Sequence, residues 1–404
     1  MSYENLIGCG MANGVAVQER SFPPPPPPNR RTSSCTFYSF LFSLLLPITA
    51  SILLYHLDSF DPAPYPLPDH TQPPLKALTK NDRILHGSDR VGVGRLQAPE
   101  DLAYDAKLGV IYTGCGDGWI KRVRFNESVS DSVIDDLVNT GGRPLGIAIG
   151  HYHELIVADT YKGLLNITSS DGSVQVLTQE AEGVKFKLTD GVGVANDGMI
   201  YFTDASYKYN FHEFIWDILE GKPHGRLMSY DPATKETKVL LKDLYFANGI
   251  AVSPDQTFVV YCETPLRRCS KYYIHGEKKG SVDDFSPNLP GYPDNIHFDG
   301  QGRAWIAFST EKTLLWDLTI RYPVIRKVTG IVEKYVGTPF IGKNGGVLVV
   351  DSEGKPCEHY YDPGLTLISS GIKIGDHLYC GSINNPYIVR LDLSKYPALP
   401  AYEQ

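Results

Sequence analysis

The sequence has few cysteines and no excess of basic charge. Seven cysteines occur in 404 residues and none forms a C-x-x-C pair, so neither a disulfide scaffold nor zinc or thioredoxin chemistry is indicated. The formal net charge of -8 provides no basic surface, and we expect no nucleic-acid partner. The motifs G-x-S-x-G and H-E-x-x-H and the Walker loop are absent, which leaves serine hydrolase, zinc protease and nucleotide chemistry without their minimal parts.

Three N-terminal segments differ in composition from the rest of the chain. Residues 1–34 are polar and include the run Pro23 to Pro28, so they predict a disordered cytosolic tail. Residues 35–57 contain no Asp, Glu, Lys or Arg. At roughly 1.5 Å per residue, a helix of this length crosses a hydrocarbon layer of about 30 Å. Residues 58–81 are rich in proline and predict an extended stalk.

The charges around the apolar segment predict how the chain crosses the membrane. Arg30 and Arg31 precede the segment, and Asp58 and Asp61 follow it. Because basic flanks stay cytosolic, this pattern predicts a single-pass type II membrane protein with everything after the span in the lumen. A cleaved signal peptide is the alternative. The long polar leader and the lack of a small-x-small cleavage site favour the anchor.

Two further features suit a lumenal compartment. The sequons Asn126-Glu-Ser and Asn166-Ile-Thr lie beyond the span and would accept glycans only there. Cys262 and Cys269 flank a short turn and could face each other across a hairpin. If oxidised they form a local disulfide; otherwise they are ordinary small apolar residues.

A repeated strand pattern occupies residues 82–395. Six stretches begin with one residue followed by a short alternating apolar strand: EDLAYD from Glu100, LGIAIG from Leu145, DGVGVAND from Asp190, NGIAVSPD from Asn248, DNIHFDGQ from Asp294 and SGIKIGD from Ser370. The intervals are 45, 45, 58, 46 and 76 residues, and a β-unit of about 40 to 50 residues is typical of propellers.

Second and third strands follow most of these stretches, which predicts an all-β, six-bladed β-propeller with four strands per blade. The segment near Arg90 to Leu96 would supply the missing strand of the last blade and close the ring. Residues 396–404 then form a C-terminal tail. A β-sandwich is the alternative, which the repeat disfavours.

The third and fifth repeats are longer because each contains an insertion with helical spacing of apolar residues. The first insertion contains Phe211 and Phe214, and the second contains Leu314 and Leu318. Both follow the second strand of their repeat, so we expect two short helical segments on one face, forming a lid over the channel. The alternative is an apolar patch that packs on the bilayer or on a partner.

The first residue of each repeat should lie at the inner end of its blade and point toward the channel axis. Glu100, Asp190 and Asp294 would then converge without a Lys or Arg at the same register, and would repel one another. Asn248 adds an amide oxygen. Hard oxygen ligands suit Ca²⁺ or Mg²⁺ better than zinc. The alternative is that each residue only caps a turn.

The chain closely resembles plant strictosidine synthase-like proteins and the adipocyte plasma membrane-associated protein group. The resemblance covers roughly residues 82–395 and lies in the blocks APEDLAYD, ADTYKGLL, LTDGVGVANDGMIYFTDAS, YFANGIAVSPD, DNIHFDGQGRAWIA and HLYCGS. The same ring is more distantly similar to paraoxonases, gluconolactonases and diisopropylfluorophosphatase, which are calcium-dependent six-bladed hydrolases. That similarity implies a Ca²⁺ site on Glu100, Asp190, Asn248 and Asp294, with Asn295 as a further ligand.

Three departures from these families limit what the resemblance implies. Asp190 stands where the hydrolases use Asn, and Leu145 stands where paraoxonases have a His. By register Ser370, or Ser369 with a one-residue gap, stands where strictosidine synthase has its catalytic Glu, and a serine cannot serve as a carboxylate base. His297 is interpreted either as a satisfied core histidine or as a base.

These observations predict a metal-dependent hydrolase of a small-molecule ester or lactone, with Asp294 nearest the reacting carbon and Ser370 as the second candidate catalytic residue. A non-catalytic lumenal binding or scaffold propeller is the alternative. A Pictet-Spengler-type condensation of an amine with an aldehyde is the third reading. The resemblance favours the plant endomembrane system, either endoplasmic reticulum or vacuole.

Overall fold

A computed structural model describes residues 34–66, 73–125, 132–337 and 342–400, and the chain divides into two units at Leu57. The first unit contains helix α1 (Ser34–Leu57). Its residues Tyr38–Leu57 have a mean hydropathy of 1.9 and none of them is buried. The segment is therefore a candidate membrane span by length and composition, although a signal sequence would meet the same criterion.

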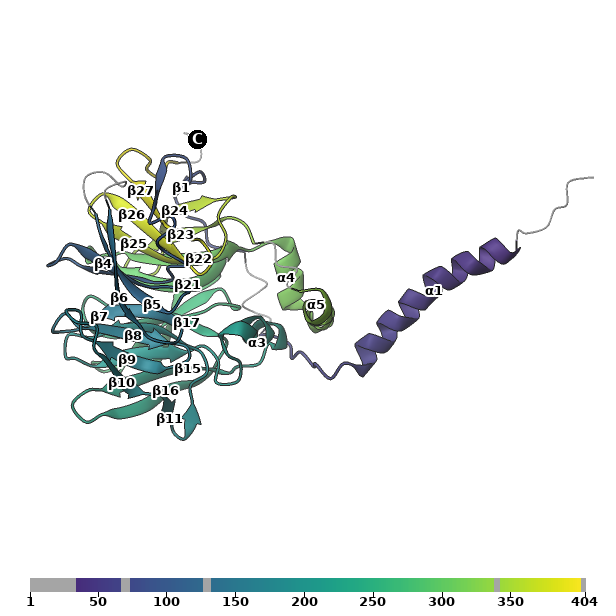
Figure 1. The fold of residues 1–404 in the computed structure, drawn as a ribbon, viewed down its shortest axis with the longest axis horizontal. Helices are drawn as coiled ribbons and strands as arrows, with labels where there is room; N and C mark the ends of the chain where they lie inside the picture. Colours follow the sequence, from purple (N-terminus) through teal and green to yellow (C-terminus); the bar gives the residue numbers. More distant parts are fainter. Residues whose placement is uncertain (1–33, 67–72, 126–131, 338–341, 401–404) are drawn as a thin grey trace, which may run out of the picture. The chain divides into compact units, whose positions relative to one another are not determined.

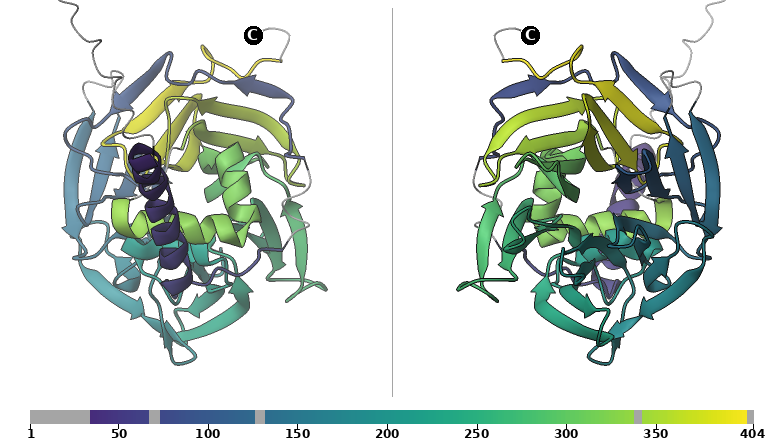
Figure 2. Two further views of the ribbon diagram at one scale, coloured as in Figure 1. Left: turned by 90° about the vertical axis from the view of Figure 1, so that its right-hand side faces the viewer. Right: turned by 90° about the vertical axis from the view of Figure 1, so that its left-hand side faces the viewer.

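The second unit, Asp58–Gln404, is a six-bladed β-propeller, which confirms the predicted fold (Figures 1 and 2). Each blade is an antiparallel sheet whose first strand lies at the centre. Blades one to three comprise β3 (Leu102–Asp105), β4 (Val110–Gly114), β5 (Trp119–Arg124) and β6 (Val133–Asn139); β7 (Pro144–Ile149), β8 (Leu155–Asp159), β9 (Gly163–Ile167) and β10 (Val174–Thr178); and β13 (Thr189–Val194), β14 (Ile200–Asp204), β15 (Gly225–Asp231) and β16 (Glu236–Leu244).

Blades four to six follow the same order. They comprise β17 (Ala247–Val252), β18 (Phe258–Glu263), β19 (Arg268–Tyr273) and β20 (Val282–Ser286); β21 (Gly291–Phe298), β22 (Ala304–Glu311), β23 (Gly345–Val350) and β24 (Pro356–Asp362); and β25 (Ile368–Ile374), β26 (His377–Ser382) and β27 (Ile388–Asp392). A small hairpin, β11 (Glu180–Ala181) with β12 (Val184–Lys185), precedes blade three.

The ring closes through the segment that precedes the first blade. Strand β2 (Ser88–Val91) pairs antiparallel with β27 and completes blade six, close to the predicted position but starting and ending earlier. This closure leaves no unpaired edge between the two ends of the repeat. Strand β1 (Thr79–Asn81) adds a fifth, parallel strand to blade five by pairing with β24.

Part of the segment that the sequence predicts as a stalk, residues 58–81, packs on the propeller. The backbone N–H of Ala63 donates to the carbonyl of Glu220 at 2.8 Å, and the Tyr65 hydroxyl donates to the carbonyl of Ile218 at 2.8 Å. Tyr65 is buried in an apolar cluster of the propeller unit. The alternating prolines of residues 58–66 hold the backbone extended. The side chains between these prolines reach the surface of the propeller. We call residues 58–66 the strap.

The central strands approach one another closely, and glycine makes this possible. Cβ atoms placed on Gly146 and Gly249 would lie 2.4 Å from the carbonyl oxygens of Asp190 and Asp294, and one on Gly191 would lie 2.8 Å from that of Asn248. Side chains longer than hydrogen would therefore push neighbouring blades apart. Each of these glycines follows the first residue of a repeat, so the sequence pattern also sets the spacing of the blades.

The two insertions form helices on one face of the propeller (Figure 1), which confirms the predicted helices. The first gives the 3₁₀-helix η2 (Phe211–Glu213) and α3 (Phe214–Glu220), and the second gives α4 (Leu314–Arg321) and α5 (Pro323–Val336). The Thr313 side chain caps α4, and Pro323 starts α5 at the position where a helix tolerates proline. We call these four helices the cap.

Candidate functional site

A cavity of about 390 Å³ lies between the cap and the inner ends of the central strands. Its walls are mostly aromatic and aliphatic and come from the cap and the blade loops: Leu145, Leu188, Phe211, Phe214, Ile215, Ile218, Phe246, Tyr292, Trp316, Leu367 and Ile383. The cap helices thus lie where the predicted lid requires. The polar side chains gather at the floor: Glu100, Asp190, Asn248, Asp294, Ser309 and Thr310.

We call Glu100, Asp190, Asn248 and Asp294 the polar ring. The structure brings these four predicted residues to one cavity, and each is at most 6% exposed. The pairing of the central strands shifts register at three of these positions, between Thr189 and Val192, Ala247 and Ile250, and Pro293 and Ile296. A bulge re-aims a side chain relative to the pleat, which is how strand residues come to face the channel mouth.

Hydrogen bonds hold the ring but leave two oxygen atoms unsatisfied. The Asn295 side-chain amide donates to Glu100 Oε1 at 2.8 Å, and the Ser309 hydroxyl donates to Asp294 Oδ2 at 2.8 Å. Glu100 Oε2 and Asn248 Oδ1 are buried and have no hydrogen-bond partner among the described residues. Because an unsatisfied buried oxygen is costly, both atoms are positioned to accept from a ligand or to bind a cation.

Burial and mutual repulsion raise the pKa of all three ring carboxyls. Burial is the largest cause for Glu100 and Asp190, and the charge of Asp294 is the next. Burial raises the pKa of Asp294 to about 7, against hydrogen bonds from Ser309 and Asn248 that lower it. The ring therefore stays fully ionised at neutral pH only if a positive charge enters it.

Arg143 is a buried cation beside the ring that the repeat comparison missed. It lowers the pKa of Glu100 and Asp190, but its guanidinium donates to the carbonyls of Pro144 and Ala98 rather than to a carboxylate. The repeat pattern gave little indication that Arg143 would lie beside the ring, because this residue precedes Leu145, the first residue of repeat two. One arginine offsets only part of the charge of three carboxyls.

The donor set of the ring fits a hard divalent cation. The two unsatisfied atoms are both oxygens, and the neighbouring carboxyls repel each other, which is the environment that Ca²⁺ or Mg²⁺ stabilises. Within the described residues, no three His, Cys, Asp or Glu side chains form a ready-made metal site. Coordination at the ring would therefore need Asn248 and solvent as well as carboxylates.

The structure places Ser370 below the ring instead of in it, which corrects the register-based prediction. Pairing of β25 shifts between Ile368 and Ser370, so the Ser370 hydroxyl donates to Asp101 Oδ1 at 2.7 Å and is fully buried. Ser369 also turns away and donates to the Glu100 carbonyl. Blade six contributes Leu367 and Ile383 to the cavity wall.

His297 does not reach this cavity either. Its Nε2 lies 2.7 Å from Asp101 Oδ1, and its ring lines a second cavity of about 470 Å³ formed by the far ends of the central strands. Asp101 also accepts from the backbone of Ile147. His297 is therefore a hydrogen-bonded histidine of the lower channel, in line with the structural interpretation.

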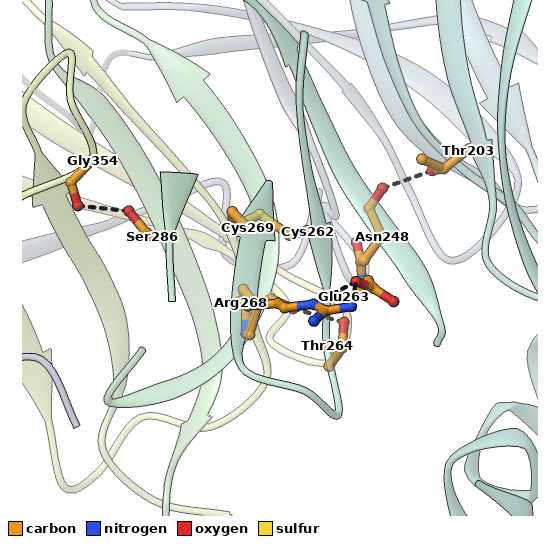
Figure 3. The surroundings of a disulfide bond; sticks show 10 residues. Thr203, Asn248, Cys262, Glu263, Thr264, Arg268, Cys269, Ser286 and Gly354 are labelled. Carbon is orange, nitrogen blue, oxygen red and sulfur yellow. Dashed lines mark hydrogen bonds and ion pairs between the residues drawn. A yellow bond between two sulfur atoms is a disulfide. The ribbon is translucent and has the colours of Figure 1, made fainter. Parts of the chain in front are cut away.

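Of the two alternatives left open for Cys262 and Cys269, the structure contains the disulfide. Cys262 and Cys269 are bonded across β18 and β19, where they pair directly (Figure 3). Thr264, two residues after Cys262, lines the cavity, so the bond fixes the start of a loop in the cavity wall. Of the two sequons, Asn166 lies half-buried in strand β9, and Asn126 lies outside the described residues.

Comparison with known proteins places this architecture in a family. Residues 190–277 match the model of strictosidine synthase, and residues 77–123 match that of the strictosidine synthase-like N-terminal region. The strictosidine synthase-like protein 6 of Arabidopsis thaliana is 56% identical over 362 residues, which cover 88% of this chain and 96% of the relative. The chain belongs to the strictosidine synthase-like family.

Proteins similar to this strictosidine synthase-like chain in sequence or in fold also occur outside plants. The adipocyte plasma membrane-associated protein of Gallus gallus is 32% identical, covering 89% of this chain and 90% of the relative. A gluconolactonase from Xanthomonas campestris is similar in fold with a TM-score of 0.54, 17% identity and coverage of 80% and 99%. The calcium-binding protein regucalcin from Agrobacterium tumefaciens has a TM-score of 0.52 at 13% identity and coverage of 78% and 95%. These two structures show the shared fold.

Proposed function

We propose that this strictosidine synthase-like protein is a membrane-anchored hydrolase of esters or lactones whose polar ring binds Ca²⁺. The observation that carries the proposal is the pair of unsatisfied buried oxygens, Glu100 Oε2 and Asn248 Oδ1, beside carboxyls with raised pKa values at the floor of an apolar cavity. The gluconolactonase and calcium-binding fold neighbours support the reaction class and the ion. A bound Ca²⁺ would polarise the carbonyl of the substrate.

The residues of the chain would divide the remaining work. Asp294 is placed to take a proton from the attacking water as the new C–O bond forms, and to return it to the leaving oxygen as the ester C–O bond breaks. The Ser309 hydroxyl, at 2.8 Å, fixes the orientation of the carboxyl. Asn295 holds Glu100 in the same way. The aromatic side chains that the cap contributes to the cavity wall would limit the access of bulk water to the floor.

Substituting Asp294→Asn in the full chain tests this role. We expect turnover of aryl esters or lactones to fall by about 10² to 10⁴, the usual contribution of a general acid-base group, with an unchanged circular dichroism spectrum. The matched control is Asp89→Asn on strand β2, where the side chain is exposed. Turnover equal to wild type in the Asp294 variant would remove that residue from the mechanism.

Leu145 favours a second candidate, a binding propeller without catalysis. It lines the cavity at the ring position of blade two and offers no group that could accept a proton. If the wild-type protein binds Ca²⁺ and apolar lactones but turns none over, this reading replaces the hydrolase. Amine-aldehyde condensation has less support, because the blade-six residues of the cavity wall, Leu367 and Ile383, carry no carboxylate.

For the location of the chain we propose single-pass type II topology in the endoplasmic reticulum or vacuole, with the propeller in the lumen. The charge asymmetry of residues 30–61 and the oxidised Cys262–Cys269 pair support it, because structural disulfides persist in oxidising compartments.

A further inference from the structure

Helix α5 is amphipathic, but it turns an apolar side outward. Val324, Val328, Ile331 and Tyr335 recur at intervals of four, three and four residues, so they lie along one side of the helix. Val324 is 59% exposed and Tyr335 is 63% exposed. A surface helix of a soluble domain normally shows the reverse arrangement.

The opposite side of α5 is buried by polar contacts with the strap. Arg326 is fully buried, and its guanidinium donates to the carbonyls of Leu219 and Ala63 and lies over the Tyr65 ring. Gly330 is also buried, and a Cβ there would lie 3.1 Å from the Phe60 ring. These contacts fix the rotation of α5, so the outward apolar stripe is a consequence of the packing and not of a loose helix.

Neighbouring cap residues extend the apolar surface. Leu314 and Leu315 of α4 are 76% and 60% exposed, and Tyr322 at the junction with α5 is also exposed. Exposed apolar side chains that gather on two helices in contact with each other are typical of an interaction site. We call the outward apolar residues of α4, α5 and their junction the cap stripe, in which Ile331 is half-buried and the others are exposed: Leu314, Leu315, Tyr322, Val324, Val328, Ile331 and Tyr335.

The chain itself indicates what covers the cap stripe. The candidate membrane span ends at Leu57, and the next residue, Asp58, pairs with Lys334 of α5 at 3.2 Å. Consecutive Cα atoms are about 3.8 Å apart, so a chain that leaves the bilayer at Leu57 brings this end of α5 to the membrane surface. Lys327 and Lys334 flank the stripe on the helix, and lysines in this position reach lipid headgroups while their stems stay in apolar surroundings.

We propose that the cap stripe is a membrane-contact surface, in which α4 and α5 lie in the interface of the bilayer that the anchor crosses. Tyr322 and Tyr335 have the amphipathic rings that favour this depth. Since Trp316 of the same α4 lines the cavity, the helix that contacts lipid also forms part of the cavity wall. Ligands dissolved in the membrane would then lie beside a wall of the cavity that contains the polar ring.

Photo-crosslinking of the full chain in lipid vesicles tests this proposal. The crosslinking amino acid p-benzoylphenylalanine replaces Tyr335, whose ring it resembles, and in a second variant Val328. The vesicles are phosphatidylcholine with a fluorescent phosphatidylcholine tracer. Val282, exposed on strand β20 of blade four, carries the same probe as the control for mere tethering by the anchor.

We expect lipid adducts at both cap positions at about ten times the yield at Val282. Equal yields at the cap and control positions would overturn the proposal. A dimer-sized adduct without lipid would also overturn it, because the stripe would then face a second copy of the chain. Neither readout depends on whether the protein hydrolyses esters.

Discussion

At the scale of single residues, we expect the charge of the polar ring to depend on whether the proposed cation is bound. Glu100 is buried, and Asp294, Asp101 and Asp190 raise its pKa after burial itself. Removing a carboxylate charge from such a cluster relieves repulsion when no cation is bound, but weakens the site when one is. The same substitution should therefore have opposite effects in the two conditions.

Glu100→Gln should separate these effects. We expect the chelator-treated variant to be at least as stable as wild type, and excess Ca²⁺ to raise the melting temperature of wild type only. At 100 times the dissociation constant, the ion adds about 2.7 kcal/mol to the free energy of unfolding. The matched control is Glu236→Gln at the exposed start of β16, and differential scanning fluorimetry reads both. The same Ca²⁺ shift in the Glu100 variant would contradict a metal site at the ring.

His359 links stability to pH in a different part of the molecule. Burial lowers the pKa of His359 to about 3, with a smaller effect from Lys80, whereas an unfolded histidine titrates near 6.5. As the pH falls, the unfolded chain therefore binds a proton at His359 before the folded chain does. The contribution of the neutral histidine to the free energy of unfolding is complete above about pH 6.5 and is lost as the pH falls toward 3. At pH 5 the free energy of unfolding is lower by roughly 2 kcal/mol, since each pH unit below the unfolded pKa costs about 1.36 kcal/mol.

His359→Leu should remove this pH dependence. The Nε2 atom is buried with no hydrogen-bond partner among the described residues, and the ring packs against Phe308 and Tyr361, so an apolar side chain suits the position. Urea unfolding at pH 7 and pH 5 gives the difference between the two chains. If the free-energy gap between them is the same at both pH values, His359 is not the titrating group.

At the scale of elements, the blades could be predicted from the repeat because the sequence features that indicate each blade lie close together in the chain. Alternation, turn residues and the interval of about 45 residues all lie within one hairpin, and the closing strand followed from the incomplete sixth copy. The positions of Glu100, Asp190, Asn248 and Asp294 followed from the same register. Ser370 did not, because the register shift in β25 leaves one residue unpaired between Ile368 and Ser370, whereas the shifts at Asp190, Asn248 and Asp294 each leave two.

Contacts between distant segments left weaker traces in the sequence. The strap reads as a proline-rich linker, yet its backbone at Ala63 accepts from Arg326, which lies 263 residues away. An arginine in a helix gives no sign that it will be buried. The cap stripe was foreseen only as one of two uses of the insertions, since helical spacing reveals two faces but not which one is outward.

The glycines after the ring positions give an element-scale prediction. In Gly249→Ala, the new Cβ would lie 2.4 Å from the Asp294 carbonyl oxygen, so blades four and five must separate. We expect a loss of about 1–3 kcal/mol, as for other overpacked sites, together with a weaker Ca²⁺ response because Asp294 shifts.

Gly193→Ala is the matched control for this change, because it also lies on a central strand but its Cβ would make an ordinary 3.4 Å contact with Val252. Thermal and urea unfolding measure both variants. An unaltered melting temperature for Gly249→Ala would show that the central strands are less tightly spaced than the structure indicates.

At the scale of the whole molecule, the cap, the disulfide and the charge asymmetry combine into one arrangement. If the proposed anchor keeps Arg30 and Arg31 in the cytosol, the Cys262–Cys269 bond would lie in an oxidising lumen and the cap stripe would lie beside the lumenal leaflet. Under the proposed function, the apolar walls of the cavity would favour substrates that partition into that leaflet over polar sugars. The proposed topology is therefore the first property to test.

Protease protection of sealed microsomes tests this topology directly. We expect protease to remove only the N-terminal tail, leaving a fragment that contains the span and the propeller, and to digest that fragment once detergent opens the vesicles. Alkylation without reductant should leave Cys262 and Cys269 unmodified, since the bond protects both, and should modify Cys357, a half-buried free cysteine, in unfolded chains. Digestion of the propeller in intact microsomes would place it in the cytosol, where a reducing pool opposes the disulfide, and the cap stripe would then face the other leaflet.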